Sequence, residues 1–167
     1  MNARVGIGYD VHRLAPGRRC VLGGVEIPHP TGPVGHSDGD AVLHALADAV
    51  LGAAGLDDLG TLFPDDAAAL KDADSRALLA EAVRRAADAG WRVGNADVVL
   101  VGDAPRIGPH RAAMRAAIAA ALGVAEGAVN VKGKSTEGLG GLAGGAGVAV
   151  HAVCLLERSD KEARARR

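Results

Sequence analysis

The chain has 167 residues and a formal net charge of −1, and 49% of its residues are hydrophobic but only 2% aromatic. This length suits one domain with a core of Ala, Val, Leu and Ile. Nucleic-acid-binding proteins usually carry a basic field, so the charge argues against that class.

The first predicted element is a strand over residues 5–12, where apolar side chains alternate with glycines and polar groups. One face is apolar. The other carries Gly6 and Gly8, which are expected to leave room beside them, and then Asp10 and His12. Residues two apart on a strand point to the same side, so Asp10 and His12 should lie together.

A tight hairpin is predicted next in residues 20–28, with its turn at Gly23 and Gly24. The prolines and glycines of residues 28–35 then indicate an irregular loop.

The first helix is predicted to begin at Asp38, with Ser37 as its cap and Asp40 in its first turn. His44 and Asp48 are four residues apart, so they lie one turn above the other. Because His44 is at the margin of the helix's apolar stripe, it could face a cleft between helix and sheet.

Asp10, His12 and His44 are therefore a candidate metal site. Two imidazoles and a carboxylate suit Zn²⁺ with one position left open for substrate. On spacing alone, histidines that only pack in the core are an equal alternative.

Two other segments offer candidate functional groups. Glu137 lies between a strand and a glycine-rich loop, although an isolated glutamate is more often a surface residue. His36 and Ser37 could donate hydrogen bonds to phosphate at a helix N-terminus, or could simply cap that helix.

The rest of the chain predicts mixed helices and strands. Residues 52–72 appear irregular, and a loop of that length tends to be functional. The later elements are expected as helices over residues 74–89 and from near Pro109 to Gly123, and as strands over residues 98–101, 129–131 and 148–156.

The last predicted strand bears on assembly. One face holds Val148, Val150, Ala152, Cys154 and Leu156, and the other holds Ala149, Val153 and Leu155 with His151. A strand that is apolar on both faces needs both covered. We therefore expect an α+β fold with helices on one face of a sheet and self-association on the other.

The remaining features concern chain organisation and location. Residues 1–157 are expected to form a single domain, and the charged residues 158–167 a disordered tail. Cys20 and Cys154 are too few and too far apart for a disulfide framework, so both are interpreted as core residues. With no apolar signal segment and no run of membrane-spanning length, a soluble cytoplasmic protein is predicted.

Four motifs resemble a known family. They are GYDVHR at residues 8–13, HSDGDAVLHALADAVLGAAGL at 36–56, DLGTLFPD at 58–65 and VNVKGKSTE at 129–137. Their order and spacing resemble the 2-C-methyl-D-erythritol 2,4-cyclodiphosphate synthase family from Arg4 to about Leu156. The resemblance implies a ferredoxin-like α/β sandwich and a homotrimer with active sites between subunits.

The resemblance also implies a reaction. The family converts 4-diphosphocytidyl-2-C-methyl-D-erythritol 2-phosphate to the 2,4-cyclodiphosphate and releases CMP, as a phosphorus–oxygen lyase of non-mevalonate isoprenoid precursor synthesis. Glu137 matches the residue that holds a second metal, Mg²⁺ or Mn²⁺, between the two phosphates of the nucleotide. His36 and Ser135 match residues that stabilise the transition state. The positions matching the ligands for Zn²⁺, or another divalent transition metal, are Asp10, His12 and His44.

Substrate contacts follow from the same resemblance. Ser37 and Asp48 are expected to bind the substrate. The methylerythritol part is expected at Asp58, Gly60 and the turn from Phe63 to Ala67, which includes Asp65 and Asp66. The cytidine nucleotide is expected at Gly102, Asp103, Ala104, Pro105, Arg106, Ile107, Gly108, Lys134 and Thr136. Around the central trimer cavity, the aromatic, arginine and glutamate common in the family are replaced by Gly141, Gly144 and Ala146. An isoprenoid diphosphate is therefore not expected to bind there.

Two other functions stay open. One is a generic zinc hydrolase acting on a phosphodiester through the same three residues, and the other is a non-enzymatic trimer that binds small ligands. The reaction product distinguishes the hydrolase from a cyclase, and the metal content of the purified protein tests the non-enzymatic trimer.

Overall fold

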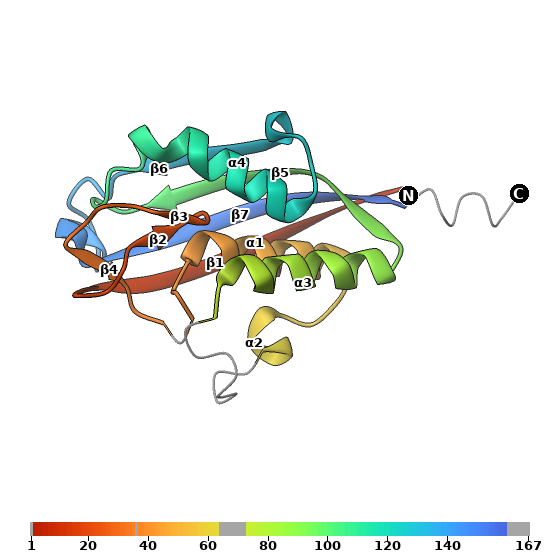
Figure 1. The fold of residues 1–167 in the computed structure, drawn as a ribbon, viewed down its shortest axis with the longest axis horizontal. Coiled ribbons are helices and arrows are strands. Elements are labelled where there is room, and N and C mark those ends of the chain that lie inside the picture. The colour runs from red at the N-terminus through yellow and green to blue at the C-terminus, as the bar shows by residue number, and fades with distance from the viewer. Residues whose placement is uncertain (1, 36, 64–72, 160–167) are drawn as a thin grey trace, which may run out of the picture.

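The protein is described here by a computed structural model that covers residues 2–35, 37–63 and 73–159. Its centre is a five-stranded sheet in the order β4-β1-β7-β5-β6 (Figure 1). β5 and β6 pair in parallel, and the other pairs described in this sheet are antiparallel. The strands are β1 (Ala3–Pro16), β4 (Thr31–Pro33), β5 (Trp91–Val101), β6 (Val129–Lys134) and β7 (Gly147–Arg158).

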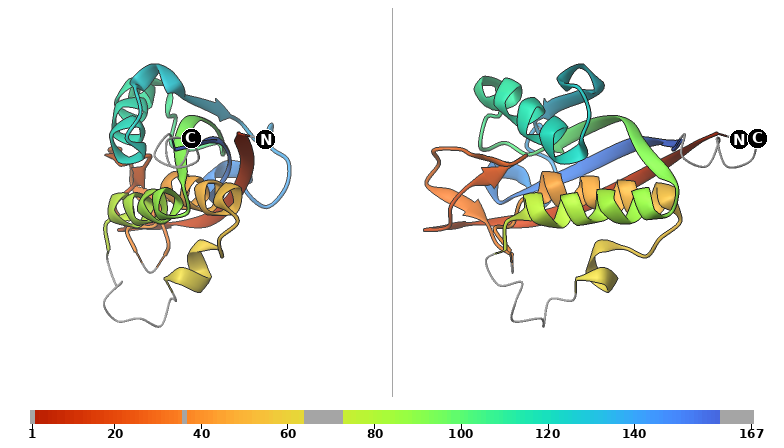
Figure 2. Two further views of the ribbon diagram at one scale, coloured as in Figure 1. Left: turned by 90° about the vertical axis from the view of Figure 1, so that its right-hand side faces the viewer. Right: turned by 45° about the vertical axis from the view of Figure 1, so that its right-hand side comes forward.

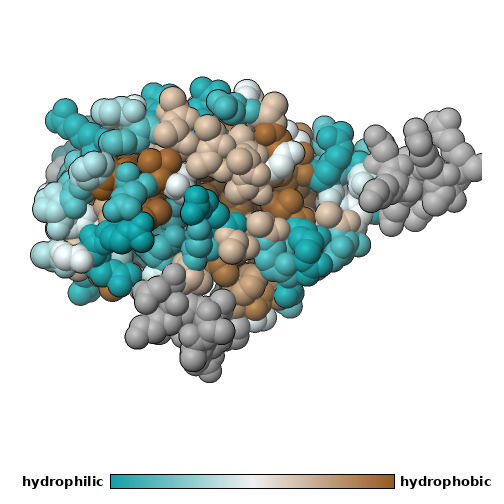
Figure 3. Space-filling view, viewed as in Figure 1, coloured by the Kyte–Doolittle hydropathy of each residue, from teal (hydrophilic) through white to brown (hydrophobic). Residues whose placement is uncertain are grey.

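Three helices cover one face of this sheet (Figure 2). They are α1 (Ala41–Ala54), α3 (Ser75–Asp88) and α4 (Arg111–Leu122). The outer side of α3 is hydrophilic (Figure 3), and on this helix Arg84 pairs with Glu81 and Asp88. The predicted α+β class, with helices on one face, is confirmed.

Shorter elements connect these layers. The predicted hairpin is present as β2 (Val21–Leu22) and β3 (Val25–Glu26). The predicted irregular segments contain two elements that the sequence pattern did not indicate, namely β4 and α2 (Leu59–Leu62). Three short 3-10 turns are η2 (Gly108–His110), η3 (Glu126–Ala128) and η4 (Ala143–Gly145).

α1 lies directly on β1 because two strand positions have no side chain. A Cβ on Gly6 would lie 2.0 Å from the carbonyl oxygen of Ala49, and one on Gly8 would lie 1.9 Å from that of Ala45. The expectation that these glycines leave open room is therefore wrong, since the helix backbone fills the space. This close approach brings the side chains of α1 next to the polar end of β1.

The start of α1 differs from the prediction. The helix begins at Ala41, and its cap is Asp40, whose carboxylate accepts hydrogen bonds from the backbone N–H groups of Val42 and Leu43. Ser37 is therefore not the cap, and Asp38 is not helical. Capping requires a side-chain acceptor next to the first free N–H groups, and the Asp40 carboxylate meets that condition.

The same carboxylate fixes the β2–β3 hairpin. Asp40 is fully buried and also accepts from the N–H groups of Gly23 (2.8 Å) and Gly24 (2.6 Å). Both glycines have positive φ, as a two-residue hairpin turn requires. The Asp40 carboxylate therefore joins the start of α1 to the hairpin.

The two faces of the sheet differ in exposure. On β7 the inward side chains, such as Val150 and Cys154, are fully buried, whereas His151 and Val153 are exposed. On β1 the apolar side chains point away from the helices and are largely exposed, including Val5 (67%) and Ile7 (70%). The face without helices is therefore apolar and open in the single chain, as the two-sided strand pattern predicted.

Both cysteines are buried, as predicted. Within the described residues, no helix has the length and apolar character needed to cross a membrane. Most of the predicted tail, residues 160–167, lies outside the described part of the chain.

Candidate metal centre and nucleotide cavity

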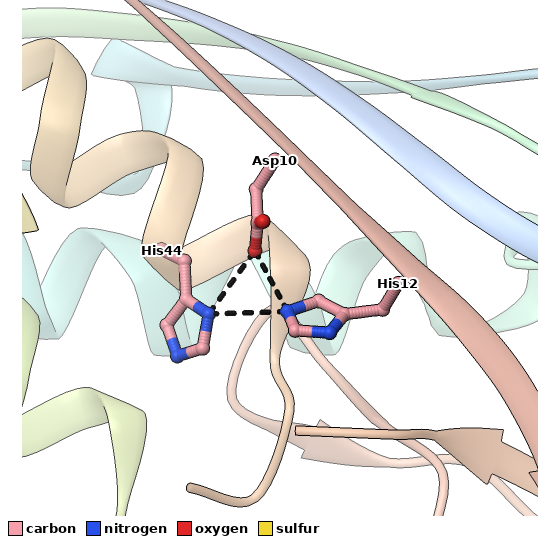
Figure 4. A group of neighbouring side chains, drawn as sticks. All are labelled: Asp10, His12 and His44. Atoms are coloured by element: carbon pink, nitrogen blue, oxygen red, sulfur yellow. Dashed lines mark hydrogen bonds and ion pairs between the residues drawn. The ribbon is translucent and has the colours of Figure 1, made fainter. Parts of the chain in front are cut away.

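Three side chains from β1 and α1 converge on one point (Figure 4). Asp10 Oδ2 lies 2.9 Å from His12 Nε2 and 3.1 Å from His44 Nδ1. The two imidazole nitrogens are 3.4 Å apart. Side chains two residues apart on β1 share one side, and α1 packs directly against Gly6 and Gly8 of that strand. These two features bring the three side chains together, so the convergence predicted from the sequence is confirmed.

Backbone contacts orient two of the three groups. The N–H of Val11 donates to Asp10 Oδ1 at 2.8 Å, which leaves Oδ2 facing the histidines. His12 Nδ1 lies 2.7 Å from the carbonyl oxygen of Val34. A carbonyl only accepts, so Nδ1 carries the proton in the neutral ring and the lone pair of Nε2 faces the cluster.

Electrostatics within the cluster favour ionised Asp10. Burial raises the pKa of Asp10, but hydrogen bonds and charge from His12 and His44 outweigh it and hold that pKa well below its usual value. Burial lowers the pKa of His12, and the contact with Asp10 more than reverses this, so the pKa of His12 lies above its ordinary value. A cation bound here would replace protons, so its affinity is expected to fall as the pH decreases.

The cluster opens into a cavity of about 350 Å³. Gly60 and Phe63, two of the positions expected to contact the methylerythritol part, line it together with Ser37. Asp48 lies nearby on α1 and accepts a hydrogen bond from the N–H of Leu59 at 2.7 Å, which fixes the start of α2. Asp58 caps α2 by accepting from the N–H of Thr61 at 2.8 Å. Three other predicted residues, His36, Asp65 and Asp66, lie outside the described residues.

A second cavity, of about 710 Å³, lies between the loops that follow β5 and β6. It shares no lining residue with the first. Its walls include most of the positions predicted to bind the nucleotide, namely Gly102, Asp103, Pro105, Arg106, Ile107, Gly108 and Lys134. Ser135 also lines it, together with Arg111, which the sequence interpretation did not select.

Asp103 joins the two loops of this cavity. Its carboxylate accepts from the N–H and hydroxyl of Thr136 (2.8 and 2.9 Å) and from the N–H of Gly144 (2.8 Å). These bonds hold the pKa of Asp103 below its usual value. Through these bonds Asp103 holds the two loops together, so Asp103 and Thr136 maintain the shape of the loops.

Glu137 lies away from the three-residue cluster. In the described part of the chain, its hydrogen-bond partner is the hydroxyl of Ser135, and no hydrogen bond or ion pair links it to Asp10, His12 or His44. It has a φ of 54°, the one positive φ among the described non-glycine residues. Such a backbone is costly for a residue with a side chain and is often found at functional sites.

Sequence reasoning missed three residues of these sites. Asp38 and Ser75 bond to each other, and Ser75 contacts His44. Arg111 adds a third cation to the second cavity beside Arg106 and Lys134. Asp38 lies within the HSDGD motif, which was a usable signal, whereas the contact of Ser75 across 31 residues had none.

Comparison with known protein families shows which family the chain belongs to. A family model described as the YgbB family matches residues 3–157. The chain belongs to the YgbB family.

Its YgbB-family relatives are similar over nearly their whole lengths. A protein named 2-C-methyl-D-erythritol 2,4-cyclodiphosphate synthase from Dechloromonas aromatica is 53% identical over 158 residues, which cover 95% of this chain and 99% of the relative. A protein of the same name from Chromobacterium violaceum is 56% identical over 156 residues, covering 93% of this chain and 99% of the relative.

Solved structures agree with the YgbB-family assignment. A structure of 2C-methyl-D-erythritol-2,4-cyclodiphosphate synthase is 41% identical, with a TM-score of 0.86, and covers 92% of this chain and 100% of that one. A form of that enzyme described as bound to CDP is 40% identical, with a TM-score of 0.85 and coverage of 92% and 100%.

Proposed function

We propose that this chain is a metal-dependent cyclodiphosphate synthase, which converts 4-diphosphocytidyl-2-C-methyl-D-erythritol 2-phosphate to 2-C-methyl-D-erythritol 2,4-cyclodiphosphate and CMP. Family membership and the names of its relatives support this activity. The observation that carries it is the convergence of Asp10, His12 and His44 at the mouth of a cavity. Oriented lone pairs at such a point suit a cation with one position left for a phosphate oxygen.

Zn²⁺ fits the donor set best. Two imidazole nitrogens and one carboxylate oxygen are typical of a catalytic zinc site with an open fourth position. Tetrahedral zinc with bonds of about 2.0–2.1 Å would separate its ligand atoms by roughly 3.3 Å. The observed separations of 2.9, 3.1 and 3.4 Å are close to that value, so little movement is required.

The reaction needs no nucleophile from the protein. An oxygen of the substrate's 2-phosphate forms a bond to the β-phosphorus, and the bond from that phosphorus to the oxygen shared with the α-phosphate breaks. CMP leaves with the electron pair. A divalent metal at the cluster would supply positive charge that polarises the attacked phosphate. Holding both groups in one cavity contributes roughly 7–11 kcal/mol in favourable cases.

Residues of this chain position the two ends of the substrate. In this proposal, Ser37 and Asp48 bind the substrate, and Asp58, Gly60 and Phe63 hold its methylerythritol part. His36 and Ser135 stabilise the transition state, and Glu137 would hold Mg²⁺ or Mn²⁺, which would offset negative charge on the nucleotide's phosphates. Asp65 and Asp66 complete the methylerythritol contacts. The nucleotide is placed in the second cavity, at residues 102–108, Lys134 and Thr136.

The two cavities are proposed to join across a homotrimer interface. In the single chain they have no lining residue in common, although the substrate must reach both. The open apolar side of β1, including Ile7 and Tyr9, supports assembly through that face. Sedimentation equilibrium should give the mass of three chains, and a monomer at micromolar concentration would contradict this arrangement.

The cation-rich wall of the second cavity supports binding of an anionic nucleotide. Arg106, Arg111 and Lys134 line it, and no described carboxylate forms an ion pair with any of them. The one acidic residue in the lining, Asp103, is engaged by Thr136 and Gly144. Three cations against one carboxylate leave this lining with a net positive charge, which suits a diphosphate.

Arg111→Gln is expected to weaken CDP binding about 5–150-fold, because a charge-assisted bond to a phosphate contributes on the order of 1–3 kcal/mol. Cytidine binding should change little, since the nucleoside has no phosphate. Isothermal titration calorimetry with CDP and cytidine measures both. The matched control is Arg92→Gln, which removes the same charge at the start of β5, the opposite end of that strand from the second cavity. Equal CDP affinities in the two variants would contradict a phosphate contact by Arg111.

The test of the activity is the identity of the product. Incubation of the protein with the cytidylyl substrate and divalent metal, followed by ³¹P NMR, should show the cyclic diphosphate and CMP. A linear phosphate product would indicate the phosphodiester hydrolase, and unchanged substrate in the presence of zinc and magnesium would indicate a binding protein.

A further inference from the structure

His44 has a second contact, on the side of its ring that faces away from the cluster. Nδ1 points to Asp10, and Nε2 lies 2.9 Å from the hydroxyl oxygen of Ser75. Ser75 is the first residue of α3 and is fully buried. The ring is therefore held between the cluster and the N-terminus of another helix.

The hydroxyl of Ser75 is itself fixed by Asp38. Ser75 Oγ donates to Asp38 Oδ1 at 2.5 Å, and the N–H of Ser75 donates to Asp38 Oδ2 at 3.2 Å. Because a hydroxyl has one proton and the carboxylate accepts it, Ser75 Oγ can only accept from His44. In the neutral ring, the form that can bind a metal, Nε2 must then carry the proton, and the lone pair of Nδ1 faces Asp10 and His12.

We infer that Asp38 and Ser75 are positioning residues that select the metal-binding form of His44. A histidine that binds a metal usually donates its other N–H to an oriented acceptor, which fixes the tautomer and the ring orientation. For His12 that acceptor is the carbonyl of Val34, at 2.7 Å. For His44 it is the Ser75 hydroxyl, polarised by a carboxylate. This inference rests on the proposed metal site but does not depend on the substrate.

Ser37 is the competing acceptor. Its hydroxyl oxygen lies 3.1 Å from His44 Nε2, and it also accepts from the N–H of Gly39 at 3.2 Å. Ser75 is closer and is the one that donates to a carboxylate. The hydrogen bond to Ser75 should therefore be the stronger of the two.

The test uses full-length protein and zinc alone, with competition against a chelator. Ser75→Ala is expected to lower zinc affinity about 10–100-fold, as loss of an outer partner usually does. Ser75→Thr, which keeps the hydroxyl, should restore most of the affinity. Asp38→Asn should fall between wild type and Ser75→Ala, and Ser37→Ala should have a smaller effect than Ser75→Ala.

A second readout separates positioning from a general loss of structure. In ¹⁵N-resolved NMR of the zinc-loaded protein, the proton on His44 Nε2 should exchange slowly in wild type and faster in Ser75→Ala. The proton on His12 Nδ1, bonded to Val34, should exchange at the same rate in both and serves as the internal control.

The outcomes distinguish the two proposals. Wild-type protein that binds no zinc would overturn the metal site and this inference together. If the wild-type protein binds zinc, and Ser75→Ala has the same zinc affinity and the same exchange rate for the His44 Nε2 proton, only the role of Ser75 would be overturned. Attachment of zinc through His44 Nε2 would do the same.

Discussion

Asp10→Asn is expected to remove zinc and to lower turnover on the order of 10³-fold or more, because a catalytic metal supplies several kcal/mol of transition-state stabilisation. Oδ2 of Asp10 is the atom that both histidines approach, at 2.9 and 3.1 Å. A neutral amide of the same size loses the negative charge that offsets the cation. Zinc content after dialysis and the rate of CMP release measure the two effects.

The fold should survive this change. The Asp10 side chain is partly exposed at the cavity mouth, and β1 remains paired with β7 over eleven residue pairs. The matched control is Asp97→Asn, which removes a carboxylate bonded to Lys132 and Asn130 on a different part of the sheet. If both variants kept zinc and turnover at wild-type levels, Asp10 would not be a metal ligand.

Glu137→Gln is expected to lower turnover by about 100-fold or more while zinc content stays the same. The amide is nearly the same size but lacks the negative charge with which Glu137 would hold Mg²⁺. Zinc should remain because, among the described residues, no hydrogen bond or ion pair connects Glu137 to the cluster. Turnover at increasing Mg²⁺ and zinc content after dialysis are the measurements.

Glu126→Gln is the control for this variant, since Glu126 is an exposed residue of η3 and does not line either cavity. Loss of zinc together with activity in Glu137→Gln would contradict the assignment of two separate metal sites. Full activity would remove Glu137 from the mechanism.

Local periodicity predicted the parts of the structure that depend on neighbouring residues. Asp10 and His12 share a side of β1 because side chains alternate on a strand. The burial of Val150 and the exposure of His151 follow from the same rule. The two glycines of the hairpin were predictable because a two-residue turn needs positive φ.

Contacts between distant segments were not predictable in this way. The pattern suggested that Gly6 and Gly8 leave space, but only the packed structure shows that the backbone of α1 occupies it. The cap of α1 was misplaced because Ser37, Asp38 and Asp40 are all suitable caps, and the hairpin N–H groups that favour Asp40 come from residues far away in sequence.

The residues of the candidate site also differ in whether the local sequence predicts them. The three cluster residues lie in motifs that the sequence displays, whereas Ser75 has no local signal and contacts Asp38 across 37 residues. Arg111 follows the predicted nucleotide loop, and its place in the cavity depends on how η2 turns into α4.

The most direct test of the metal centre is a crystal structure of the protein grown with zinc, with diffraction measured on both sides of the zinc absorption edge. The expected result is one anomalous peak bonded to Asp10 Oδ2, His12 Nε2 and His44 Nδ1. The absence of a peak between these atoms at saturating zinc, or a peak that does not contact His44, would contradict the proposed site and the mechanism built on it.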